Sequence, residues 1–207
     1  MEVTMKEKFK EMFERVKQIS FKTKDTWATI KDEEATVSGI FKNYLLILAA
    51  VPALAKFLGR MIIGYPVPFS RSIRLSFGES LVTALIEYLI VLVGIWAVSK
   101  IISFFAPKFN AVQDDVKSFK LSAYSYSPYL AAGILYIIPS LSPLVGLVGI
   151  YALVVLYFGL PIVLDVPKEK VLPFFVVIIV SMVVIYIIIG AISNLFLNIF
   201  TPDVFIG

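Results

Sequence analysis

The 207-residue chain contains no cysteine and no histidine, and it has few asparagines and glutamines. Without cysteine there can be no disulfide, thiolate nucleophile or Cys/His zinc site, and without histidine the commonest general base is missing. The sequence also lacks paired catalytic carboxylates, a Ser-Lys dyad, a Gly-rich phosphate loop and a cluster of metal-ligating residues. It therefore predicts a protein that is not an enzyme, with no catalytic, cofactor-binding or metal-binding residues. The low content of thermolabile residues hints at a thermophilic prokaryote, archaeal or bacterial.

Charged residues are scarce as well. They make up 16% of the chain, whereas hydrophobic residues make up 59%, and the mean hydropathy is +0.89. A soluble domain is usually about half apolar and about a quarter charged. This composition predicts a membrane protein whose first partner is the lipid bilayer. The formal net charge of +4 is too small to indicate binding to nucleic acid.

Long apolar stretches predict an all-α, polytopic membrane protein, a bundle of five transmembrane helices. Roughly 20 apolar residues cross a bilayer as a helix, and a lone strand would leave its backbone groups unsatisfied in lipid. The expected spans are about 37–63, 79–105, 122–138, 144–164 and 171–198, within a transmembrane domain of residues 37–207. The short, uncharged turn from Pro139 to Pro143 joins the third and fourth spans as an antiparallel hairpin.

Residues 1–36 are expected to form a cytoplasmic amphipathic or interfacial segment. Residues 1–19 predict an amphipathic helix, because apolar residues recur at helical spacing opposite a row of lysines and glutamates. The apolar row consists of Met5, Phe9, Phe13, Val16 and Ile19. Such a helix can lie in the membrane interface or dock on another part of the protein or on a partner, and the sequence leaves both open. Trp27 is expected at headgroup depth, although it could also pack a short helix against the bundle.

The distribution of lysine and arginine predicts the topology. Cytoplasmic loops of membrane proteins carry an excess of basic residues. With the amino terminus inside, most basic residues fall on inner segments, and only Lys56, Arg60, Arg71 and Arg74 fall on outer ones. We therefore expect a multi-pass protein of the plasma membrane with a cytoplasmic amino terminus and an external carboxyl terminus.

A candidate intramembrane polar site centres on Glu87, in the second span. An intramembrane acid costs about 2.5–3.5 kcal/mol on insertion scales and is a functional candidate by default. Glu87 shares a helical face with Thr83 and could hold a proton, a cation or a substrate amine. It could equally be bonded to a polar residue of another helix, such as Asn194. The other members of this candidate site are Tyr124, Tyr126, Tyr151, Tyr186 and Asn194.

Small residues on the third and fourth spans predict helix packing. Small side chains let helix backbones approach closely in lipid. The residues concerned are Ala123, Ser127, Ala131, Gly146, Gly149 and Ala152. These faces could serve contacts within the chain, a homo-oligomer or other membrane proteins.

A series of short motifs resembles the Yip-one family of Ypt/Rab-interacting five-span membrane proteins, in its prokaryotic branch. The motifs are Tyr124–Pro128 (YSYSP), 131–135 (AAGIL) with Pro139, Gly149–Tyr151 (GIY), Tyr157–Pro161 (YFGLP) and Val166–Lys170 (VPKEK). Weaker matches are Trp27, 51–55 (VPALA) and 105–109 (FAPKF). The resemblance implies a cytoplasmic amino terminus, five helices and an external carboxyl end. Eukaryotic relatives are associated with Rab GTPases and vesicle trafficking, but their Asp-Leu-Tyr-Gly-Pro motif is absent from this sequence.

Two functional hypotheses follow from the sequence. The first is a non-enzymatic membrane protein that organises or shapes the bilayer, or acts as a trafficking-like adaptor, through its inner amphipathic segments. The alternative is a small transporter or channel that uses the Glu87 carboxylate.

Overall fold

The computed structural model describes residues 5–64 and 74–200, with the side chains of 5, 6, 8, 186, 189 and 191–200 excepted. The described residues form helices and no strand, which agrees with the all-α expectation. The α-helices are α1 (Met5–Phe21), α2 (Thr23–Asp32), α3 (Val37–Ile40), α4 (Leu46–Ile62), α5 (Phe77–Phe105), α6 (Asp115–Ser125), α7 (Ser127–Ala132), α8 (Ser142–Val163) and α9 (Lys168–Phe200). A π-helical turn, η1 (Phe41–Leu45), joins α3 to α4, and the 3-10 helices are η2 (Ala106–Phe109), η3 (Gly133–Ile137) and η4 (Pro139–Leu141).

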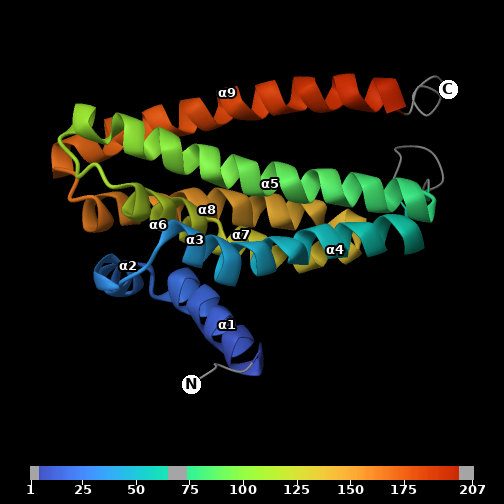
Figure 1. Ribbon diagram of the computed structural model, residues 1–207, viewed down its shortest axis with the longest axis horizontal. Coiled ribbons are helices and arrows are strands. Elements are labelled where there is room, and N and C mark those ends of the chain that lie inside the picture. Colours follow the sequence, from blue (N-terminus) through green and yellow to red (C-terminus); the bar gives the residue numbers. More distant parts are fainter. Residues whose placement is uncertain (1–4, 65–73, 201–207) are drawn as a thin grey trace.

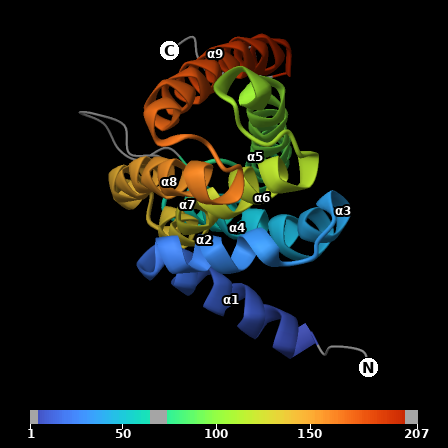
Figure 2. The same cartoon turned by 90° about the vertical axis from the view of Figure 1, so that its left-hand side faces the viewer.

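The long helices α4, α5, α8 and α9 run along the long axis of the molecule (Figure 1). Viewed end-on, α1 and α2 form a layer on one side of the bundle and α9 lies on the opposite side, against α5 and α8 (Figure 2). One end of the bundle gathers α2, η2 and the turn between α8 and α9. There Lys31 Nζ lies 2.6 Å from the Asp165 carboxylate, and Val112 N–H donates to the Leu164 carbonyl at 2.8 Å. We call this the α2 end, and the opposite end, at η4, the Pro139 end.

Three of the described helical stretches are long and apolar enough to cross a membrane. They are Val37–Ile62, Phe77–Phe109 and Pro139–Val163. On α5, Leu85, Leu89 and Val93 turn more than half of their surface outward at one-turn spacing. Such a row suits contact with lipid rather than water.

The segment expected as a continuous third span is broken into three parts. α6 begins at Asp115, where the Asp114 carboxylate caps the helix by accepting from the N–H groups of Val116 and Lys117 at 2.7 and 2.9 Å. α6 ends at Ser125, and α7 follows with Pro128 in its first turn, where the missing N–H of proline does no harm. The chain then tightens into η3 beside α4, where a Cβ added to Gly133 would lie 2.5 Å from the Pro52 Cβ. Only glycine allows this close approach.

The amino-terminal helices dock on the bundle. Trp27, Ile19 and Ile30 are fully buried, so Trp27 packs α2 against the bundle. The apolar row of the first helix divides in the structure. Val16 and Ile19 face the protein, whereas Phe9 and Phe13 are 50% and 67% exposed.

Candidate functional site

Glu87 lies in a three-residue ion-pair cluster between α4 and α5. Arg60 Nη2 donates to Glu87 Oε1, and Lys56 Nζ lies 3.4 Å from Glu87 Oε2. Lys56 and Arg60 are four residues apart, so both side chains extend from one face of α4. The Arg60 side chain is only 7% exposed, and those of Lys56 and Glu87 are 25% and 30% exposed.

The cluster explains how an acid is tolerated inside the bundle. A buried charge is costly unless it is paired and hydrogen-bonded, and Glu87 has two cationic partners. Two positive charges and one negative charge leave the cluster with a net charge of +1, by 2 − 1. The Glu87 carboxylate is therefore already neutralised by the protein, which disfavours its use as a cation-binding group.

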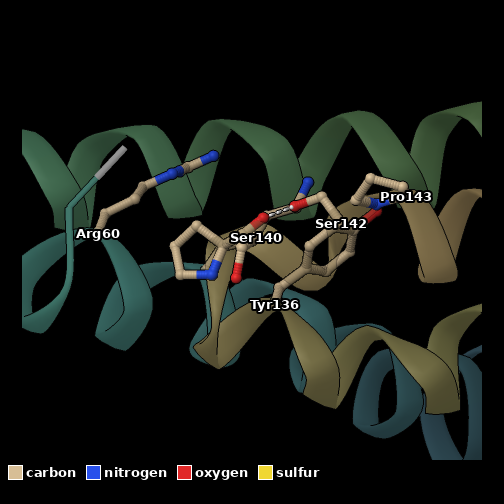
Figure 3. A pocket seen from close by; sticks show the side chains of 7 residues that line it. Arg60, Tyr136, Ser140, Ser142 and Pro143 are labelled. Atoms are coloured by element: carbon tan, nitrogen blue, oxygen red, sulfur yellow. Dashed lines mark hydrogen bonds between the residues drawn. The ribbon is translucent and has the colours of Figure 1, made fainter. Parts of the chain in front are cut away.

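A cavity of about 510 Å³ opens beside this cluster at the Pro139 end. It is lined by Lys56, Arg60, Tyr136, Pro139, Ser140, Ser142 and Pro143. Arg60 extends from α4 toward Ser140 and Ser142 (Figure 3). Lys56 Nζ lies 4.6 Å from the centroid of the Tyr136 ring, and Ser142 Oγ donates to the Pro139 carbonyl at 2.6 Å. The cavity thus combines two cations, two serine hydroxyls and a phenol.

The other residues of the candidate polar site lie elsewhere. Thr83 donates to the Glu79 carbonyl of its own helix at 2.7 Å. Tyr124 packs edge-on against Tyr44 at a centroid distance of 4.9 Å. Tyr151 donates to the Ser20 carbonyl at 2.6 Å. The side chains of Tyr186 and Asn194 fall outside the described residues.

Tyr126 lines a second cavity of about 240 Å³ between α7 and α8. Gly146, Gly149 and Ala152 line the same cavity. A Cβ on Gly149 would touch the Tyr129 ring at 3.4 Å, whereas a Cβ on Gly146 would have no atom within 4 Å. Among the other small residues, Ala123 and Ser127 are fully buried, and Ala131 is half-buried.

A second set of polar contacts fixes α2 to the bundle. Lys120, on α6, is 3% exposed, and its ammonium donates to the carbonyls of Ile30 and Glu33 at 2.7 and 2.5 Å. These carbonyls end α2, where the negative end of the helix dipole favours a cation. Burial lowers the pKa of Lys120 below its usual value, and the nearby Glu33 carboxylate partly offsets this.

Trp27 completes the attachment of α2. Its indole N–H donates to the Val155 carbonyl on α8 at 2.9 Å. The ring can approach this backbone because Gly159 has no side chain: a Cβ there would lie 2.8 Å from Trp27 Cε2. The sequence singled out Trp27 as an aromatic residue near the first span, but it indicated Lys120 only as one lysine on the polar face of a charged segment, and its burial beneath α2 had no signal of its own.

Within the described part of the chain, no group of three or more His, Cys, Asp or Glu side chains could hold a metal ion. The charged cluster with its cavity, and the docked amino-terminal helices, are therefore the two candidate sites. The charged cluster could recognise a charged ligand. The docked helices attach an amphipathic segment to the membrane bundle.

Comparison with known proteins identifies the family. Residues 17–192 match the model of the Yip1 domain. The inner membrane protein YohC of Escherichia coli K12 is 27% identical over 148 residues, which cover 70% of this chain and 76% of the relative. The YohC protein of Escherichia coli O6:H1 matches to the same extent. No solved structure matches the chain. Because the domain match extends from the docked helices α1 and α2 into α9, the chain belongs to the Yip1 family of membrane proteins.

Proposed function

We propose that this Yip1-family protein is a non-enzymatic organiser of the membrane, which shapes the bilayer through α1. The observation that carries the proposal is that α1 and α2 are fixed to the bundle while α1 turns aromatic side chains away from it. Phe9, Phe13 and Phe21 are 50%, 67% and 83% exposed.

The exposed face of α1 has the pattern of an interfacial helix. Lys10 and Lys17 are exposed and Glu14 is half-buried, so charged side chains flank the exposed Phe9 and Phe13. An interfacial helix buries its apolar side about 5–10 Å into the boundary between headgroups and acyl chains. Aromatic side chains inserted in one leaflet enlarge that leaflet relative to the other, and this asymmetry bends the bilayer.

The attachment of α1 to the bundle makes this insertion into one leaflet effective. Arg15 pairs with the Glu33 carboxylate at 2.5 Å, and Tyr151 donates to the Ser20 carbonyl. These contacts add to those of Trp27 and Lys120. Because α1 cannot reorient freely on the bundle, the lipid around it must adjust to the inserted side chains.

The proposal includes five spans, with the α2 end in the cytoplasm and the carboxyl terminus outside. α9 is 33 residues long, so its helix extends about 50 Å at about 1.5 Å per residue. Residues 122–138, from the last turn of α6 through α7 and η3, supply the remaining crossing beside α4. Lys31, Lys100, Lys108 and Lys117 lie on segments that meet at the α2 end, as the excess of basic residues on the cytoplasmic side requires. The transporter alternative has no comparable support, because two cations already neutralise Glu87.

Reconstitution into vesicles tests this function. The purified protein is added to extruded vesicles at increasing protein-to-lipid ratio, and vesicle shape is recorded by electron cryo-microscopy. We expect the wild type to produce narrow tubules or small vesicles and Phe9→Ser/Phe13→Ser to leave the vesicles round. Phe104→Ser is the matched control, because Phe104 is 63% exposed but belongs to α5. Round vesicles with the wild type, or the same remodelling by the double variant, would refute the proposal.

A further inference from the structure

We propose that the cavity at the Pro139 end is a binding site for a phosphate ester, supplied either by the headgroup of an anionic phospholipid or by a soluble phosphate ester. This site lies at the opposite end of the bundle from α2. It is independent of the role proposed for α1, so either proposal can fail alone.

The charges of the cavity favour an anion. Lys56 and Arg60 belong to its lining, whereas Glu87 contacts them from α5 and is not a lining residue. Glu87 therefore contacts the two cations from outside the cavity and offsets part of their charge, while the cavity itself presents positive charge. The planar guanidinium of arginine matches the geometry of phosphate oxygens, and lysine adds a second charged donor.

The amino-terminal end of α8 also favours an anion. α8 begins at Ser142, beside the cavity, with Pro143 in its first turn. The amino-terminal end of a helix carries about half a positive charge, which favours negatively charged groups there. The hydroxyls of Ser140, Ser142 and Tyr136 can donate to the remaining phosphate oxygens.

The size and the position of the cavity fit a headgroup. Its volume of about 510 Å³ lies within the range of about 300–1,000 Å³ found for small-molecule sites. Arg60 is two residues from the end of α4, Ser140 is exposed in η4, and Pro143 is exposed in the first turn of α8. Helix ends and exposed turns lie at the depth of lipid headgroups, so a phospholipid can reach the cavity from the bilayer.

Titration of the purified protein in neutral detergent tests the site. The probes are short-chain phosphatidylglycerol, sn-glycerol 3-phosphate, and diacylglycerol as the phosphate-free control, with affinity measured by microscale thermophoresis. We expect saturable binding of phosphatidylglycerol and none of diacylglycerol. Equal binding of sn-glycerol 3-phosphate would identify a soluble phosphate ester as the ligand, and its failure to bind would identify the lipid. Binding of neither phosphate compound, or equal binding of diacylglycerol, would overturn the proposal.

Variants of the cavity place the binding at this site. Lys56→Gln should weaken phosphate binding at least tenfold. Lys42→Gln removes the same charge from the opposite end of the same span and should leave the affinity unchanged. Ser140→Leu fills the exposed mouth of the cavity without changing its charge, so it should also weaken binding tenfold even if Lys56→Gln fails to fold. Unchanged binding in Ser140→Leu would place the phosphate elsewhere and refute the site.

Glu87→Gln tests the sign of the charge that the site prefers. An anion site should bind phosphate at least as tightly when this carboxylate is removed, whereas a site organised for a cation would lose its ligand. Loss of phosphate binding in a folded Glu87→Gln protein, to the level of Lys56→Gln, would contradict the proposal.

Discussion

Lys120 shows how one residue can join the amino-terminal segment to the membrane bundle. Its side chain crosses from α6 to the carbonyl end of α2, where it replaces water as the partner of the Ile30 and Glu33 carbonyls. A hydrogen bond from a charged donor contributes about 1.5–3 kcal/mol, more than a neutral one. The buried ammonium therefore compensates for its own desolvation by satisfying carbonyls that the helix leaves open.

We expect Lys120→Met to weaken this junction. The methionine fills a similar volume but leaves buried carbonyls without a donor, at a cost of about 1–3 kcal/mol in the free energy of unfolding. The loss should appear in detergent-denaturation curves and as faster proteolysis of the link between α2 and α3. Lys117→Met, on the same helix, is the control. Equal behaviour of the two variants would show that the α2 junction does not depend on Lys120.

A second residue makes the fold sensitive to acid. Hydrogen bonds from Lys100 Nζ and Ser103 Oγ to Asp115, both 2.7 Å long, hold the pKa of that carboxyl below its usual value. Because the folded-state pKa is depressed, the stabilisation is complete above the unfolded pKa of about 3.9 and disappears as the pH falls through the folded value. The side chain of Asp115 is 58% exposed, so solvent screening limits the gain to about 1 kcal/mol or less.

Asp115→Asn should therefore lower the melting temperature by a few degrees at pH 7, and this effect should shrink as the pH falls below about 4. Thermal melts over this pH range measure the difference between wild type and variant. Lys100→Gln removes the partner and should give the same pH dependence. A difference that does not shrink as the carboxyl is protonated at low pH would contradict the assignment.

At the scale of elements, two glycines of α8 have opposite roles. A Cβ at Gly159 would lie 2.5 Å from Leu121 Cδ2 and 2.8 Å from Trp27, whereas Gly146 faces open space within the described part of the chain. We expect Gly159→Ala to destabilise the protein by about 1–3 kcal/mol through overpacking. Gly146→Ala should be neutral, or stabilising by up to about 1 kcal/mol, because alanine favours helix. Thermal melting separates the two, and equal destabilisation would show that close approach at Gly159 is unimportant.

The third apolar segment shows where sequence reasoning is weakest. Its hydrophobic content predicted a single helix over about 122–138, but the structure begins a helix at Asp115 and interrupts it between Ser125 and Ser127. Asp114 and Pro128 were the available signals, as a helix cap and a helix-start residue. The 3-10 stretch after Gly133 had no such signal, since it depends on contact with Pro52 of another helix.

At the scale of the whole molecule, the proposed topology can be tested directly because the chain has no native cysteine. Gln113→Cys lies beside the α2 end and Ser140→Cys lies at the Pro139 end. In intact cells a membrane-impermeant maleimide should label Ser140→Cys and a cysteine appended after Gly207, but label Gln113→Cys only after permeabilisation. The reverse pattern would invert the topology, and different accessibility of Ser140→Cys and the appended cysteine would change the number of crossings.

The sequence was sufficient to predict the helical class and the family, because hydropathy and ordered motifs extend along most of the chain. It also identified Glu87 as unusual. It did not predict the partners Lys56 and Arg60, since the pairing depends on the register in which α5 packs along α4. The cavity depends on that same register and on the path of η4. Both follow from contacts between distant segments, which periodicity within one segment cannot reveal.

The contact between Trp27 and Val155 also constrains biosynthesis. These residues are 128 positions apart, and ribosomes add about 5–20 residues per second. The first helices to emerge must therefore remain without their docking surface for about 6–26 seconds, until the fourth apolar segment has been translated. During that interval their aromatic side chains have only the lipid surface or a chaperone to cover them, so the layer that is made first can dock only after most of the bundle has been made.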